Sequence, residues 1–94
     1  MNTIFRVTLN PVDRLTGIKL GIYTYKVRSR GESIAEKMAI RHFKEEVKDA
    51  WVMQIMAKYD ITYEQASSMV ADGVLTMPQY YDIEVVSITK ISED

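Results

Sequence analysis

Hydrophobic and polar residues alternate near the N-terminus of the chain. Between residues 4 and 9, every second side chain (Phe5, Val7, Leu9) is apolar and those between them are polar. This period of two predicts a strand with one buried face. The proline-containing residues 10–14 predict a turn, because proline fixes its own backbone and disfavours helix in the residue before it. We expect the loop that starts there to protrude.

The alternation changes phase in two later stretches of strand-like composition. In residues 18–28 one face carries Ile18, Leu20 and Ile22 and the other carries Tyr23, Tyr25 and Val27. A bulge at Gly21, near this change of phase, would give the strand a common inward face. A long strand covered on both faces is the alternative. Residues 80–91 are rich in β-branched and aromatic side chains and predict a third strand, with a change of phase at Val85 and Val86. We expect the last three residues, Ser92 to Asp94, to form a frayed acidic tail.

Residues 33–59 contain neither glycine nor proline and have helical periodicity. Ser33 and Glu36 have the spacing of a capping box and predict the helix start. The apolar residues form two stripes, Ala39, Phe43, Val47 and Ala50, then Val52, Ile55, Met56 and Tyr59. At about 100° per residue these stripes lie well over 90° apart. We therefore expect two helices with a break near Lys48 and Asp49, and Asp49 as the second N-cap.

A second capping-box pattern, Thr62 to Gln65, predicts a short helix over residues 63–71 that Gly73 ends. Residues 74–79 then form a connection to the last strand. The expected order is β-β-α-α-α-β in one α+β domain spanning residues 1–94. We expect the first and last strands to pair, giving a three-stranded antiparallel sheet with two to three helices packed on one face.

Composition narrows the possible classes of protein. The 94 residues are 47% hydrophobic and 27% charged, which is typical of a globular domain. No apolar run approaches the ~18 residues of a membrane span. The chain has no cysteine, so disulfides, thiolate metal sites and a cysteine nucleophile are excluded. We expect a cytoplasmic protein that does not bind membranes.

The net charge of −1 combines two unlike halves. Residues 1–48 contain ten Lys and Arg against five Asp and Glu, whereas residues 49–94 contain two against eight. This split favours one basic and one acidic surface if the fold keeps the halves apart. The alternative is that the two halves neutralise each other in space.

The residue pattern does not predict a catalytic site. The single histidine, His42, has no partner at triad or metal-ligand spacing on its helix, so we expect it at the helix surface or core edge. The carboxylates are spread over several elements, and no glycine-rich phosphate loop is present. We therefore expect a non-enzymatic protein without a cofactor, a metal or a small-molecule substrate.

Two kinds of macromolecular partner fit the charge pattern. Cations interleaved with tyrosines at residues 18–28 favour single-stranded nucleic acid, provided that the tyrosines face outward. Opposite charge poles with tyrosine and arginine anchors favour a protein partner instead. A structural or assembly role is a third alternative. The candidate partner-binding residues are Arg6, Arg14, Lys19, Tyr23, Tyr25, Lys26, Arg28, Arg30, Asp82 and Glu84.

With the strand at residues 4–9, the basic strand at residues 18–28 and the helix start Ser33-Ile34-Ala35-Glu36, the chain resembles small phage-encoded anti-CRISPR proteins. Those directed at type I, particularly type I-F, surveillance complexes are the most similar in size and element order. The resemblance implies a non-enzymatic inhibitor that docks on Cas subunits, near or on the guide RNA, and blocks recruitment of target DNA. It implies the cytoplasm of an infected bacterium as the location.

Overall fold

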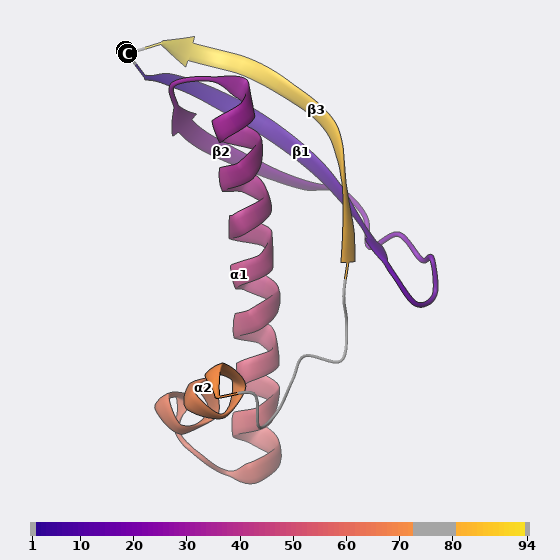
Figure 1. Ribbon diagram of the computed structural model, residues 1–94, viewed down its shortest axis with the longest axis vertical. Helices are drawn as coiled ribbons and strands as arrows, with labels where there is room; N and C mark the ends of the chain where they lie inside the picture. Colours follow the sequence, from indigo (N-terminus) through magenta and orange to yellow (C-terminus); the bar gives the residue numbers. More distant parts are fainter. Residues whose placement is uncertain (1, 73–80, 94) are drawn as a thin grey trace. The chain divides into compact units, whose positions relative to one another are not determined.

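The computed structural model describes residues 2–72 and 81–93. Figure 1 shows the elements, which are β1 (Thr3–Asp13), β2 (Tyr23–Ser29), α1 (Glu32–Tyr59), α2 (Tyr63–Ala71) and β3 (Tyr81–Glu93). The expected α+β class is confirmed, with two helices in the described part of the chain in place of three. The expected helix stop at Gly73 and the connection at residues 74–79 lie outside the described residues.

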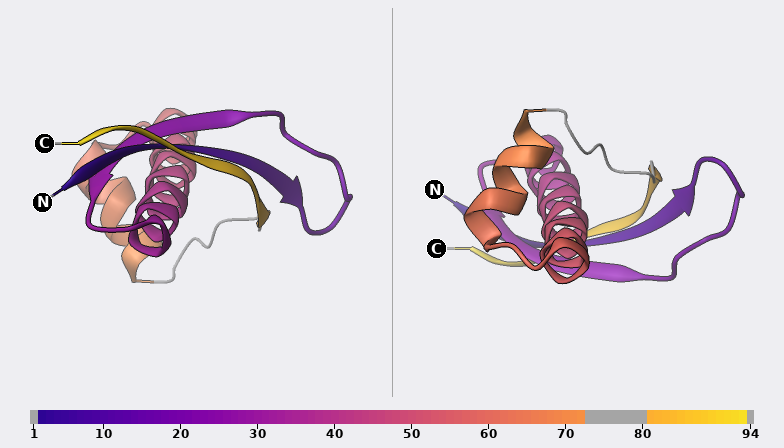
Figure 2. Two further views of the ribbon diagram at one scale, coloured as in Figure 1. Left: turned by 90° about the horizontal axis from the view of Figure 1, so that it is seen from above. Right: turned by 90° about the horizontal axis from the view of Figure 1, so that it is seen from below.

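The three strands form one antiparallel sheet in the order β2-β1-β3, so the first and last strands pair as expected. Figure 2 shows the strands side by side. Phe5, Val7 and Leu9 of β1 are buried, and we call their side of the sheet the inner face. The opposite side is called the outer face.

The chain forms two compact units. The sheet unit comprises Met1–Phe43 and Gln79–Asp94, and the helical unit comprises Lys44–Pro78. Helix α1 contributes its first part to the sheet unit and its remainder to the helical unit.

Strand β1 continues to Asp13, so the turn expected at residues 10–14 begins later, at Arg14. The regular pairing with β2 ends at Leu9, whereas the pairing with β3 continues to Asp13. The carbonyl of Pro11 accepts a hydrogen bond from Leu20 N at 2.9 Å, on the side where β2 has ended. A backbone N–H at position 11 would point to the same side as this carbonyl, away from β3. Because regular pairing with β2 has already ended there, proline at this position costs the sheet no regular hydrogen bond.

The second strand is shorter than expected, because residues 18–22 belong to the loop before it. Gly21 has a positive φ of 113°, which glycine adopts without strain, but it lies outside the strand and forms no bulge there. The change of phase thus marks a loop boundary. From Tyr23 onward, odd-numbered side chains face inward and even-numbered ones are exposed.

The change of phase expected in the third strand is confirmed. Thr8 pairs with Ser87 and Leu9 with Val85, so Val86 is an extra residue that forms a β-bulge. The predicted fraying of the C-terminal residues is wrong for residues 92 and 93, because β3 pairs with β1 as far as Glu93.

Helix α1 is continuous from Glu32 to Tyr59, so the break expected near Lys48 and Asp49 is wrong. It begins one residue before Ser33, which is therefore not the N-cap; the carbonyl of Gly31 instead accepts from the N–H of Ala35.

The core of the sheet unit joins α1 to the inner face. Ala35, Ala39 and Phe43 of α1 are buried. The ring of Phe43 packs edge-on against Tyr23 at 5.2 Å and Tyr81 at 5.7 Å between centroids. Each such aromatic pair stabilises by roughly 0.5–1.5 kcal/mol beyond area burial.

The helical unit has its own core of Val52, Ile55 and Ala66, so α1 uses different residues for each unit. The short helix α2 covers the expected residues 63–71. Its capping box is confirmed, because Gln65 N donates to Thr62 Oγ1 at 3.2 Å and Thr62 N donates to Gln65 Oε1 at 3.0 Å.

Candidate functional site

The outer face of the sheet brings together part of the predicted set. Cross-strand register places Arg6 of β1 directly opposite Lys26 of β2, and Ile4 opposite Arg28. All three cations are exposed. We call Arg6, Lys26 and Arg28 the basic cluster, and it occupies one end of the outer face.

The acidic end of the outer face lies further along β1. Asn10 pairs with Glu84 and Val12 with Asp82, so the two carboxylates share this face as their alternation indicated. Asp82 Oδ1 accepts hydrogen bonds from Nε and Nη2 of Arg14 at 3.1 and 2.9 Å. Both side chains are more than 60% exposed, so this ion pair stabilises the fold by at most about 1 kcal/mol. It fixes the orientation of Arg14.

The tyrosines of β2 face the interior of the sheet unit. Tyr23 packs against Phe43, and Tyr25 stacks on His42 with 6.1 Å between ring centroids and 18° between planes. A base-stacking surface on the outer face is therefore excluded for this pair. His42 is an exposed helix-surface residue, as expected. On the same inner side, burial raises the pKa of Tyr81, with smaller contributions from the charge of Asp13 and from Tyr23.

Residues 14–22 between β1 and β2 form a loop, called the hairpin loop below, that is held by its own hydrogen bonds. The carboxylate of Asp13 accepts from Leu15 N at 2.8 Å and Thr16 N at 3.2 Å. The carbonyl of Asp13 accepts from Gly17 N at 2.8 Å, and Gly17 has a φ of 73°, which suits glycine. Lys19 forms an isolated bridge with Val12. These bonds fix the backbone of the loop.

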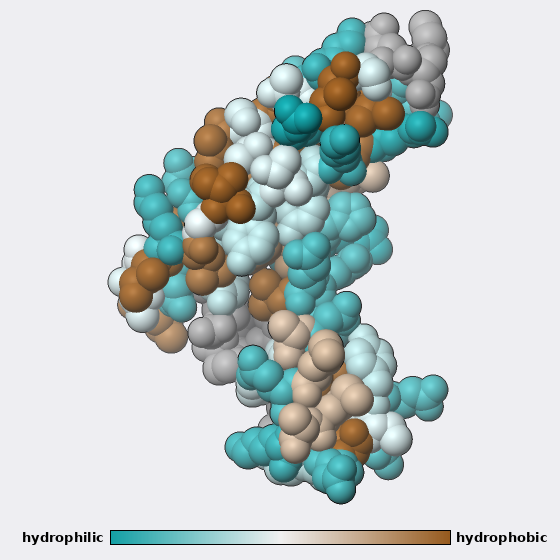
Figure 3. All heavy atoms as spheres, turned by 180° about the vertical axis from the view of Figure 1, so that it is seen from behind, coloured by the Kyte–Doolittle hydropathy of each residue, from teal (hydrophilic) through white to brown (hydrophobic). Residues whose placement is uncertain are grey.

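The hairpin loop presents large aliphatic side chains to solvent. Leu15 is 82% exposed, Ile18 63%, Leu20 42% and Ile22 62%. Hydrophobic residues at this end of the sheet are visible as brown spheres in Figure 3, at the edge where the loop lies. Three of the four, Ile18, Leu20 and Ile22, were expected in the second strand. Gly17 and Gly21, which flank Ile18 and Leu20 and both have a positive φ, were the signal for a loop.

The remaining predicted residues are separate. Lys19 is exposed on the hairpin loop, and Arg30 is exposed in the turn before α1. The sheet unit does not keep the two charged halves of the sequence apart, because β3 brings acidic residues back beside the basic N-terminal strands. The sheet unit contains nine Lys and Arg against seven Asp and Glu, and the helical unit three against six.

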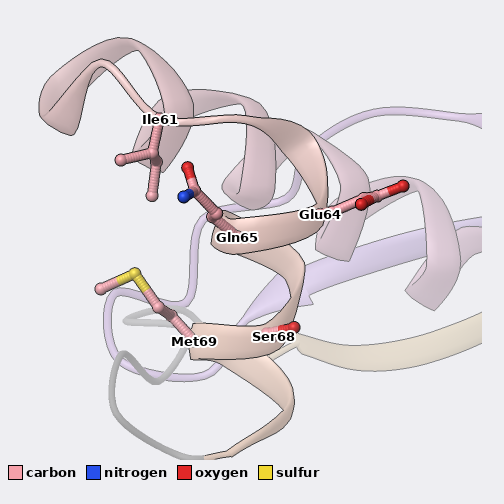
Figure 4. A pocket seen from close by; sticks show the side chains of 5 residues that line it. All are labelled: Ile61, Glu64, Gln65, Ser68 and Met69. Atoms are coloured by element: carbon pink, nitrogen blue, oxygen red, sulfur yellow. The ribbon is translucent and has the colours of Figure 1, made fainter.

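A shallow pocket lies along α2 in the helical unit and is lined by Ile61, Glu64, Gln65, Ser68 and Met69. Figure 4 shows Ile61, Gln65 and Met69 on one side of the helix and Glu64 on the other. The Gln65 side chain already serves the capping box. Nearby, the hydrogen bond that Tyr63 donates to the Asp49 carboxylate at 2.8 Å raises the pKa of Tyr63, with a further contribution from the charge of Asp49.

Within residues 2–72 and 81–93, no group of three His, Asp or Glu side chains is arranged to hold a metal ion. Within the same residues, no helix is both long enough and apolar enough to cross a lipid bilayer. Comparison of the chain with protein-family models, with curated proteins and with solved structures gives no match.

Proposed function

We propose that this chain is a non-enzymatic protein-interaction inhibitor that docks through the hairpin loop. The observation that carries the proposal is the display of four exposed aliphatic side chains on a loop with a hydrogen-bonded backbone. Exposed apolar side chains gathered in one place are typical of protein-binding surfaces.

The fixed backbone favours binding because little conformational entropy is lost when the loop is immobilised against a partner. Full burial of an aliphatic side chain stabilises a complex by about 1.5–3 kcal/mol, and Ile18, which is already partly buried, contributes less. Several of these side chains must therefore be buried together to offset the cost of association.

The charges of the loop indicate the chemistry of the partner. Arg14 is paired with Asp82, whereas Lys19 is exposed beside the aliphatic residues. A protein surface with an apolar cleft bordered by carboxylates complements this arrangement.

The partner that we propose is a Cas subunit of a type I, particularly type I-F, CRISPR surveillance complex. The resemblance to small phage-encoded anti-CRISPR proteins supports this choice. Docking there would block recruitment of target DNA inside an infected bacterial cell. This mode of action requires surface complementarity and no catalytic group.

A pull-down with purified type I-F surveillance complex tests the proposal. We expect the chain to be retained, and Ile18→Asp to reduce retention at least tenfold, because a buried carboxylate would replace an apolar contact. Met53→Asp is the matched control, since Met53 is also 63% exposed but lies on α1.

Two results would contradict the proposal. One is the absence of any retention of the wild-type chain on the complex. The other is equal loss of retention in the Ile18→Asp and Met53→Asp variants, which would show that the loop is not the contact surface.

A further inference from the structure

We propose that the basic cluster on the outer face binds the phosphodiester backbone of nucleic acid. This site is distinct from the hairpin loop, and the inference does not depend on the identity of the protein partner. It assigns a ligand class to Arg6, Lys26 and Arg28.

Two cations of the basic cluster lie directly opposite each other. In an antiparallel pair, opposed Cα atoms lie only about 4.5–5.5 Å apart, and like charges at such positions are destabilising. Arg6 and Lys26 occupy one of these pairs on β1 and β2. An anion bound between them would convert the repulsion into attraction.

Positive charge also extends along β2. Arg28 lies two residues beyond Lys26 on the same face, which is about 6.6 Å along the strand. The cluster therefore forms a short row, which suits a chain of phosphates better than a single small anion.

Hydroxyl groups continue from the basic cluster across the sheet. Thr8 pairs with Thr24 on one side and with Ser87 on the other, and Thr89 lies opposite Arg6. Serine and threonine hydroxyls commonly donate to phosphate oxygens in nucleic-acid complexes. The three strands thus place cations and neutral donors side by side.

The acidic end of the outer face lies too far from Arg6 to cancel its charge. Asn10, which pairs with Glu84, is four residues from Arg6, or about 13 Å along the strand. Exposed charges at that separation are screened at physiological salt, where the Debye length is about 8 Å. The carboxylates instead limit how far a polyanion can extend across this face.

The inward position of the tyrosines determines the kind of recognition. Because Tyr23 and Tyr25 pack against Phe43 and His42, they are not presented on the outer face for base stacking. Binding through phosphate contacts alone carries no base specificity. We therefore expect similar affinity for oligonucleotides of different sequence.

Fluorescence anisotropy of the full chain with short labelled RNA, single-stranded DNA and duplex DNA tests the inference between about 50 and 200 mM salt. For single strands, we expect Lys26→Gln and Arg6→Gln each to reduce the slope of log affinity against log salt by about 0.7. Arg6→Lys keeps the charge and should keep the slope. Lys37→Gln, an exposed position on α1, is the matched control.

The inference is supported if the slope of log affinity against log salt is reduced in Lys26→Gln and Arg6→Gln. The slope should be unchanged in the Arg6→Lys and Lys37→Gln variants. The inference is overturned if no oligonucleotide binds at low salt, or if Lys37→Gln changes the slope as much as Lys26→Gln does. Displacement of the oligonucleotide by poly-L-glutamate at equal charge concentration would also overturn it, since that would show a preference for any polyanion, acidic proteins included.

Discussion

At the scale of single residues, the basic cluster combines a cost in stability with a capacity to bind. The register of β1 and β2 holds the Cα atoms of Arg6 and Lys26 opposite each other, so both side chains start from neighbouring positions on the outer face. A residue pair that weakens the fold is expected where it serves another purpose.

We predict that Lys26→Gln raises the stability of the isolated chain. Removal of one of two opposed like charges should increase the free energy of unfolding by about 0.2–1 kcal/mol at low salt. The measurement is the urea midpoint of Lys26→Gln against wild type, with Lys37→Gln as the control. A lower midpoint for Lys26→Gln would contradict the assigned repulsion.

The sequence was sufficient to place Arg6 and Lys26 on polar faces, because strict alternation surrounds each of them. It was not sufficient to orient Tyr23 and Tyr25. The apolar positions before Gly21 favour one face and the tyrosines the other, and only pairing with β1 decides which face is covered. The contact of Arg14 with Asp82 was equally beyond local patterns, since the two residues are 68 positions apart.

At the scale of elements, α1 shows how one continuous helix accommodates two apolar stripes. Its first part buries Ala39 and Phe43 in the sheet unit, and its later part buries Val52 and Ile55 in the helical unit. Two stripes therefore indicated two packing environments along one helix. The inference of a break assumed that a helix buries a single face.

Proline substitution at Ala50 distinguishes one continuous helix from two helices with a break near Asp49. If Asp49 were the N-cap of a second helix, residue 50 would be its first residue, where proline is favourable. In a continuous helix, proline removes a backbone hydrogen bond and clashes with the preceding turn, at a cost of about 3 kcal/mol. We predict that Ala50→Pro lowers the free energy of unfolding by this larger amount. Ala50→Gly should lower it by only about 1 kcal/mol.

Chemical denaturation monitored by circular dichroism measures the free energy of unfolding of both variants and of the wild type. Ala50 is exposed, so loss of core packing does not confuse the comparison. An Ala50→Pro variant as stable as the wild type would contradict the continuous helix.

Local signals predicted some features and not others. The capping box at Thr62 and the change of phase at Val85 and Val86 depend on residues close in sequence, and both are present. The helix start expected at Ser33 and the bulge expected at Gly21 are wrong. The extent of β1 was not predictable in this way. Continuation of the strand through Pro11 depends on where β2 ends and on pairing with β3, which is more than 70 residues distant.

At the scale of the whole molecule, the two proposed surfaces both belong to the sheet unit and differ in chemistry. The hairpin loop offers aliphatic contact and Lys19, and the outer face offers the basic cluster with neighbouring hydroxyls. A partner that contains both protein and nucleic acid could engage both. The hydrophobic–polar pattern predicted the charged surface in part and missed the apolar one, because it assigned Ile18, Leu20 and Ile22 to the second strand.

We propose that the hairpin loop mediates inhibition by docking. The most direct test measures binding of target DNA by a type I-F surveillance complex while the chain is titrated in. We predict that saturating chain abolishes DNA binding. Ile18→Asp should raise the concentration needed for half-inhibition by at least about tenfold, the equivalent of about 1.4 kcal/mol, and Met53→Asp should not. Unchanged DNA binding at saturating chain would contradict the account.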